Sequence, residues 1–433
     1  MRAITDDSNL FKEAIIAFDK TATISLFKIF ETNLSKRIYG YLILDFNLSK
    51  DMVFDDFTIH KSIVVDLDIN NSGSQQVKKA FVSPVWMPER INFVSSHLYT
   101  LALSAICSFA FERPVHSTKN DNFNGFEIPN IFALKSVGVE FPTTVAGSSA
   151  VKVNIHPDII LLWEKRLKEL INLIDILLLQ KKGNKKLRYD SVMRSFRLIQ
   201  LAHLNRKEDF DLGYSFLIAG TESVSQTIKR KTSNKHATFH DQWKELGKTN
   251  NLVKTLFEEY ARLKMIDDNE ANRDLGKRFA EFVMVYNKDT NWEEVLYDEL
   301  ITEGLNVRQK FVNEISVQHE YTPSDFSSIR FAKIIKDTYA LRSKFFHTGL
   351  ALPHTKTSNS FSIRYFQIVL NINKINELDK KKSKERETEI SEAEAEKQWF
   401  ITRTVLVTYE LMSTMSRVSI TNYLKEELIN STN

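Results

Sequence analysis

The sequence predicts a mainly α-helical protein in which a mixed α+β region precedes a long helical region. Strand-like segments lie in the first part of the chain, and six of its eight prolines come before residue 160. From about residue 157 onward, apolar residues recur with helical spacing over long segments. We therefore expect an N-terminal α+β domain at 1–155 and a helical domain at 156–433, with a helical insertion at about 230–320.

Composition places the chain among ordinary globular proteins. Hydrophobic residues make up 42% of the 433 residues and charged residues 26%. The formal net charge is only 59 − 55 = +4, so any surface for a polyanion has to be local. The single cysteine, Cys107, leaves no intramolecular disulfide and fits a reducing compartment.

Localisation is expected to be cytoplasmic, without membrane association. The first residues, MRAITDDSNLFKEA, lack the basic-then-apolar profile of a secretion signal. The apolar run nearest to them, residues 98–111, has 14 residues and is too short to span a bilayer. It is typical of a buried helix instead.

The N-terminal region shows strands and one helix. IYGYLILDF (38–46) and SIVVDLDI (62–69) are rich in β-branched and aromatic residues with partial alternation, which predicts strands. Residues 92–112 have a helical pattern. Pro114 prevents that helix from continuing.

The rest of the chain is predicted to form a bundle of long helices. The predicted helix that ends at 349 has Thr322 as N-cap, Pro323 at its first position and Gly349 as C-terminal cap. A charge-dense run at 380–397 is expected to be solvated. In chain order the predicted helices are 156–180, 188–205, 209–229, several within 239–317, one ending at 349, and 399–424.

One helix carries an arginine among its apolar residues. Over 326–347 the apolar side chains fill an arc of roughly 160°, and Arg342 lies near its middle. A buried arginine needs a carboxylate, a phosphate or a cleft. His347 lies about 140° around the same helix, because five residues advance roughly 500°. The two side chains meet at one ligand only if the helix unwinds at 347–349 or if a second copy supplies the other half.

The segment RSKFFHTG, residues 342–349, resembles the motif of HEPN ribonucleases: an arginine, a polar residue, a short spacer and a histidine at the end of a late helix. It is most similar to the Apea-like branch, known mostly from bacterial defence systems. Two other pairs have comparable spacing, Arg90 with His97 and Arg197 with His203, but an apolar residue follows each arginine. Only Arg342 is followed by a polar residue.

That polar residue is Ser343, whereas the family at large more often has Asn, Asp or His. Serine is familiar in the Apea-like branch. The segment 211–226, DLGYSFLIAGTESVSQ, also resembles an earlier core helix of that branch, with Glu222 at its acidic position. The resemblance covers about 186–426, interrupted by the insertion, and implies a HEPN-like helical bundle for this region.

The resemblance implies RNA cleavage without a metal or cofactor. The 2′-hydroxyl attacks the adjacent phosphate and leaves a 2′,3′-cyclic phosphate and a 5′-hydroxyl. An imidazole with a pKa of about 6.5 suits the proton transfer, and a guanidinium suits the phosphate oxygens. The implied site residues are His347 as general acid/base, Arg342 as phosphate clamp, Ser343 as hydrogen-bonding helper, Glu222 orienting Arg342 or offsetting its charge, Lys344 on the RNA backbone, and Tyr339 beside them.

The partners implied by the resemblance are RNA, a second copy that pairs through the motif helices, and a phage-derived trigger or an antitoxin. The chain is then a bacterial defence effector of the toxin type, whose N-terminal domain senses the trigger or holds the nuclease inactive. Two other interpretations stay open. One is an inactive HEPN-fold module that binds RNA, a nucleotide or a protein. The other is a structural protein in which Arg342 and His347 only interact favourably with the negative end of the helix dipole.

Overall fold

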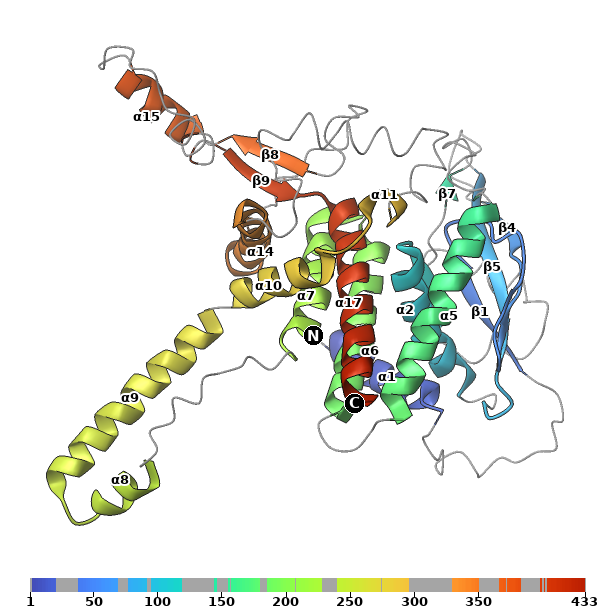
Figure 1. Cartoon of the computed structure of the whole chain (residues 1–433). Helices are drawn as coiled ribbons and strands as arrows, with labels where there is room; N and C mark the ends of the chain where they lie inside the picture. Colours follow the sequence, from blue (N-terminus) through green and yellow to red (C-terminus); the bar gives the residue numbers. More distant parts are fainter. Residues whose placement is uncertain are drawn as a thin grey trace.

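The computed structural model describes most of the chain, and the account that follows is confined to these parts. They are residues 2–20, 38–68, 77–91, 95–118, 144–145, 155, 157–179, 185–206, 208–227, 240–273, 275–295, 329–349, 366–370, 372–382, 398, 401 and 403–432. The described part is mainly helical with a sheet near the N-terminus (Figure 1), which confirms the prediction of a mainly-α chain.

The N-terminal sheet is built around one long strand, β5 (Val77–Trp86). The second half of β5 lies between β1 (Tyr39–Leu44) and β3, and its first half pairs with β4 (Ile63–Asp68). Every pair in this sheet is antiparallel. β1 and β4 confirm the strands predicted at 38–46 and 62–69. The remaining strands are β2 (Met52–Val53), β3 (Thr58–Ile59), β6 (Val115–Ser117) and β7 (Thr144–Val145).

Helix α2 (Ser96–Phe111) lies beside this sheet. It packs against β1 and β6, against α1 (Arg2–Phe18), and against α5 and α6 of the following region. All of its side chains except that of His97 are buried, as its almost wholly apolar and small-residue sequence requires. The helix was predicted at 92–112 and ends just before Pro114, in agreement with the pattern.

Four long helices form the centre of the helical region. α6 (Lys185–Asn205) and α7 (Phe210–Ser225) make the predicted hairpin, with the Asp209 carboxylate accepting a hydrogen bond from the amide of Leu212 at the start of α7. α5 (Pro157–Leu179) and the last helix, α17 (Tyr409–Thr432), pack on one another and on this hairpin (Figure 1).

The core continues across residue 155. Phe109 on α2 and Phe196 on α6 have their ring centroids 4.5 Å apart, and the same buried cluster runs from Phe11 to Leu424. The domain boundary at 155 stays a prediction, since the described apolar core joins elements from both sides of it.

The last predicted helix, 399–424, is wrong in its first part. Residues Arg403–Val407 form strand β9, which pairs antiparallel with β8 (Phe366–Leu370). The amide of Val407 donates to Thr338 Oγ1 (3.1 Å), so the strand is fixed by contacts from distant parts of the chain. The C-terminal region is therefore not all-helical: a two-stranded sheet lies beside α14.

The other helices of this region are α10 (Leu275–Asn287), α11 (Trp292–Val295), α14 (Ile329–Thr348) and α15 (Ile372–Lys382). α10 packs between α14 and α17. The expected caps of α14 at Thr322 and Pro323 lie outside the described residues, as do most of the charged run at 380–397 and the end of the predicted helices within 239–317.

Two helices stand away from the rest of the chain. α8 (His240–Leu246) and α9 (Asn251–Arg273) form a hairpin that projects from the start of α10 (Figure 1). They confirm helices within the predicted insertion. No helix in the described part has both the length and the apolar character that a membrane span needs.

Candidate active site

Arg342 and Glu222 lie in contact between two helices. Glu222 is in the last turn of α7, and its Oε2 is 3.1 Å from Nη1 of Arg342 on α14. The Glu222 side chain is 8% exposed and that of Arg342 is 22% exposed. α14 is brought here because Phe331, Ile334 and Ile335 are buried in the core on the same side. Of the three partners expected for an arginine in the apolar arc, Arg342 thus has a carboxylate.

Glu222 is held by two further donors. The hydroxyl of Tyr339 donates to Glu222 Oε1 at 2.8 Å, and Nε2 of Gln226 donates to the same oxygen at 3.0 Å. Burial raises the pKa of Tyr339 well above its ordinary value, and the hydrogen bond to Glu222 and its negative charge raise it further. Tyr339 is therefore a neutral donor at physiological pH, and the carboxylate is fixed in position toward Arg342.

The ring of Tyr339 is itself held by α10. Its centroid is 5.2 Å from that of Phe279. A Cβ atom at Gly276 would lie 2.9 Å from Cδ1 of Tyr339, so this first turn of α10 has room for glycine alone unless the ring shifts. Arg342, Glu222 and Tyr339 therefore lie in one cluster.

The end of α14 bears on the first way in which Arg342 and His347 could meet one ligand, namely unwinding of the helix at 347–349. The helix continues through His347 to Thr348, and the amide of Gly349 donates to the carbonyl of Phe345 at 2.8 Å. Gly349 has φ +65°, the left-handed conformation of a C-terminal glycine cap, which confirms its predicted role. The helix does not unwind at His347, so that alternative is wrong.

A continuous helix keeps Arg342 and His347 about 140° apart. Lys344 is exposed. The side chains of Ser343 and His347 lie outside the part of the chain that the structure describes. A second copy that supplies the other half of the site stays a prediction.

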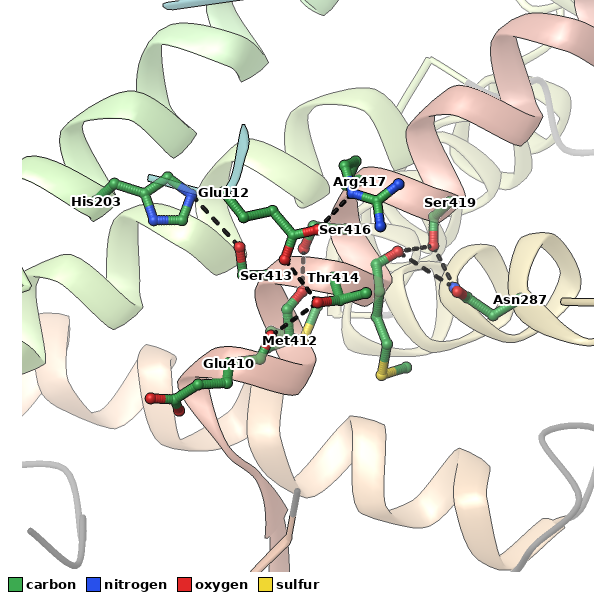
Figure 2. A network of polar contacts seen from close by, with 11 residues as sticks. Glu112, His203, Asn287, Glu410, Met412, Ser413, Thr414, Ser416, Arg417 and Ser419 are labelled. Carbon is green, nitrogen blue, oxygen red and sulfur yellow. Dashed lines mark hydrogen bonds and ion pairs between the residues drawn. The ribbon is translucent and has the colours of Figure 1, made fainter. Parts of the chain in front are cut away.

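A second polar cluster lies inside the molecule, where α2 meets α17 (Figure 2). Glu112 directly follows α2 with φ 55°, and its carboxylate accepts a hydrogen bond from Arg417 Nε and one of 2.6 Å from Thr414 Oγ1. Both charged side chains are almost buried, 12% and 11% exposed. This ion pair connects the N-terminal region to the last helix.

His203 belongs to the same cluster (Figure 2). Its Nδ1 is 3.1 Å from the hydroxyl of Tyr409 and its Nε2 is 3.4 Å from Ser413 Oγ. Burial lowers the pKa of His203 to about 3, and the positive charges of Arg206 and Arg113 lower it as well. The imidazole is therefore neutral at physiological pH and closed off from a macromolecular substrate. Sequence reasoning set the Arg197 and His203 pair aside because Leu198 follows the arginine.

Sequence reasoning missed this buried cluster. The available signal was STMSRVS (413–419), where serines recur at positions 413, 416 and 419 of a helix. All three serines are buried, and the hydroxyls of Ser416 and Ser419 each donate to a carbonyl one turn earlier. Their side chains also meet Thr221 and Asn287 from neighbouring helices. The spacing identifies a polar face of α17, but its partners come from elsewhere in the sequence.

Among the described residues, no three His, Cys, Asp or Glu side chains gather as metal ligands. No known protein family, no curated protein and no solved structure matches the chain. The resemblance to HEPN ribonucleases therefore rests on the residues of 342–349 and 211–226.

Proposed function

We propose that the chain is a metal-independent endoribonuclease of the HEPN type, acting as a homodimer in a bacterial defence or toxin system. The observation that supports this most is the ion pair between Glu222 and Arg342. It joins the two segments in which the motif resemblance lies, although 120 positions separate these residues, 342 − 222 = 120.

The chemistry assigned to Arg342 follows from this contact. Glu222, which is 8% exposed, holds the guanidinium, while the Arg342 side chain keeps 22% of its surface exposed to solvent. A scissile phosphate approaching from solvent is then bound by a guanidinium that is already oriented, which lowers the cost of ordering it during reaction. Lys344, which is exposed on the same helix, contacts a neighbouring phosphate of the RNA.

His347 is the proton carrier in this proposal. It lies five residues beyond Arg342 on a continuous helix, so the two act on one phosphate only when they come from different copies of the chain. Each cleavage site then contains Arg342 from one copy and His347 from the other. A mixed dimer with one inactive Arg342→Ala copy and one inactive His347→Ala copy retains one intact site.

This complementation is the decisive experiment. The two variants are purified separately, mixed and assayed for RNA cleavage in EDTA. Each alone is expected to lose at least about 100-fold in rate, since each removes a group that stabilises the transition state. Their mixture is expected to recover up to roughly a quarter of the wild-type rate. Random pairing makes about half of the dimers mixed, and each mixed dimer has one of its two sites intact. Lys336→Ala, which changes an exposed residue of α14, is the matched control and retains full activity.

The second candidate is an inactive HEPN-fold module that binds RNA, a nucleotide or a protein. The contacts of Glu222 favour it, because a carboxylate held by Arg342, Tyr339 and Gln226 also stabilises the packing of α7 on α14 without any catalytic role. RNA binding by the wild type with no cleavage at any tested pH establishes this candidate. Cleavage that Arg342→Ala and His347→Ala leave unchanged contradicts the nuclease assignment of both residues.

A further inference from the structure

The hairpin of α8 and α9, residues 240–273, is referred to below as the arm. It leaves the body at the start of α10 (Figure 1). The arm concentrates exposed apolar surface: five of the thirteen large apolar side chains that are exposed in the described chain belong to it. These five are Trp243, Leu246, Leu252, Leu256 and Leu263.

One apolar face of α9 is covered by α8. The rings of Trp243 and Tyr260 are 6.0 Å apart in an edge-to-face contact, and Val253 and Phe257 are half-buried on the same side. The turn between the helices is well formed, since Asn250 Oδ1 accepts a hydrogen bond of 3.0 Å from the amide of Leu252. The arm is therefore a defined helical hairpin with its own internal packing.

A second apolar face of α9 has no such cover in the described chain. Leu252, Leu256 and Leu263 are 70%, 62% and 49% exposed. At 100° per residue they lie within about 40° of one another, roughly a quarter turn from the face that α8 covers. Three leucines aligned over about 16 Å on one helix form a stripe of the kind that packs against another helix. We refer to these three residues as the leucine stripe.

The charges of the arm favour a copy of itself as partner. Residues 240–273 contain six basic and seven acidic side chains, so the net charge of the arm is only 6 − 7 = −1. Arg262 Nε donates to Glu259 at 2.8 Å, and Lys248 pairs with Glu245 at 2.8 Å, so these charges are compensated within the hairpin. Two arms therefore repel one another little, and neither sign of charge predominates on the arm to attract a strongly acidic or basic partner.

We propose that the leucine stripe is a contact between two copies of the chain, in which the α9 helices pack antiparallel around a two-fold axis. An axis near the middle of the stripe places Leu252 against Leu263 of the second copy at each end. Leu256 of each copy then lies beside the axis, opposite Glu259 of the other copy. Glu259 is at the edge of the stripe, where its carboxylate accepts a hydrogen bond from Arg262 of its own chain. The stripe is self-complementary in this arrangement, as a two-fold contact requires.

This interface is separate from the pairing of motif helices in the proposed nuclease, and it stands without any nuclease activity. Oligomerisation through the arm and RNA cleavage are measured independently, so either proposal fails without the other.

Disulfide trapping tests the arrangement directly. The one native cysteine, Cys107, is completely buried and does not interfere. Under mild oxidation, Leu256→Cys in the full chain is expected to give a covalent dimer of about 100 kDa from the 50.2 kDa chain. Leu161→Cys on α5 replaces a leucine of similar exposure, 53%, and is expected to stay monomeric on a denaturing gel. Equal trapping of the two variants overturns the proposal.

Sedimentation or light scattering measures the strength of the same contact. Leu252→Glu/Leu256→Glu is expected to raise the dissociation constant of the arm contact at least tenfold, because it places four carboxylates in an apolar interface. At most the separate dimer of motif helices then remains. Leu161→Glu is expected to leave the dissociation constant unchanged, and circular dichroism verifies that both variants are folded. A wild type that is monomeric at 100 µM, or an unchanged constant in the arm variant, overturns the proposal. In the former case another protein or a further segment of this chain covers the stripe.

Discussion

Tyr339 lies between Gly276 of α10 and Glu222 of α7, touching the first through its ring and the second through its hydroxyl. A Cβ at position 276 would come within 2.9 Å of the ring, and the hydroxyl donates to Glu222 at 2.8 Å. Glu222 in turn pairs with Arg342. Three helices therefore meet at one side chain, and the orientation of the candidate phosphate clamp depends on all of them.

Removing the charge of Glu222 is expected to destabilise the fold. Glu222→Gln keeps the shape of the side chain but leaves Arg342, which is largely buried, without its carboxylate. The expected loss in the free energy of unfolding is about 1–3 kcal/mol, less than for a fully buried pair because Arg342 remains partly exposed. Urea unfolding at pH 7 measures this. Glu245→Gln, in an ion pair that is mostly exposed, is the matched control, with an expected change within about 0.5 kcal/mol.

Gly276→Ala is expected to displace the ring of Tyr339. The added methyl group has to push the ring aside, which costs about 1–3 kcal/mol by overpacking. Tyr339→Leu, which removes the ring, makes the added methyl group less costly. The double variant is therefore expected to be at least about 0.5 kcal/mol more stable than the sum of the two single changes predicts. Strict additivity in urea unfolding shows that Gly276 does not act through Tyr339.

Local patterns were sufficient to predict the elements whose sequences carry their own period or caps. β1 and β4 contain enough β-branched and aromatic residues to be predicted as strands. α14 ends at Gly349, whose left-handed conformation closes the last turn of the helix. The position of Arg342 in an apolar arc also led to the expectation of a carboxylate, a phosphate or a cleft, and the structure shows the carboxylate of Glu222. That expectation followed from the cost of burying a charge and needed no knowledge of the fold.

Elements that depend on distant partners were missed. RTVLV (403–407) is followed directly by the pattern of α17, so its strand character comes from pairing with β8 and from the contact with Thr338. β5 contains Pro84, which speaks against a central strand by composition. Pro84 is nevertheless accommodated opposite Tyr41, and its carbonyl accepts a hydrogen bond of 2.8 Å from the amide of His60.

The ion pair of Glu112 and Arg417 is another contact that one sequence does not reveal, and it is expected to be sensitive to removal of either partner. Arg417→Met leaves a carboxylate almost buried, and the expected loss in stability is about 3–5 kcal/mol. Glu112→Gln/Arg417→Met removes both charges and is expected to recover at least half of that loss, because no buried charge remains. Chemical unfolding of the three proteins forms the test. Equal stability of Arg417→Met and the wild type shows that the pair contributes nothing.

His203 is expected to make the protein less stable as pH falls below neutrality. Its folded pKa is about 3, below the ordinary value of 6.5, because burial and the nearby Arg206 and Arg113 disfavour the charged form. Between these two values the unfolded chain binds a proton that the folded chain does not. The stability contributed by the neutral His203 is therefore fully present above pH 6.5. Below that pH the free energy of unfolding falls by up to about 1.4 kcal/mol per pH unit.

The change His203→Asn isolates this contribution. Asparagine does not titrate and is able to hydrogen-bond near Tyr409 and Ser413, so the variant is less stable at pH 7 but has a shallower pH dependence. Thermal or urea unfolding at several values between pH 6.5 and 5 measures the difference in slope, above the range in which ordinary carboxylates titrate. Parallel curves for the two proteins would mean that His203 binds its proton equally in both states, and the closed, uncharged imidazole described above would then be incorrect.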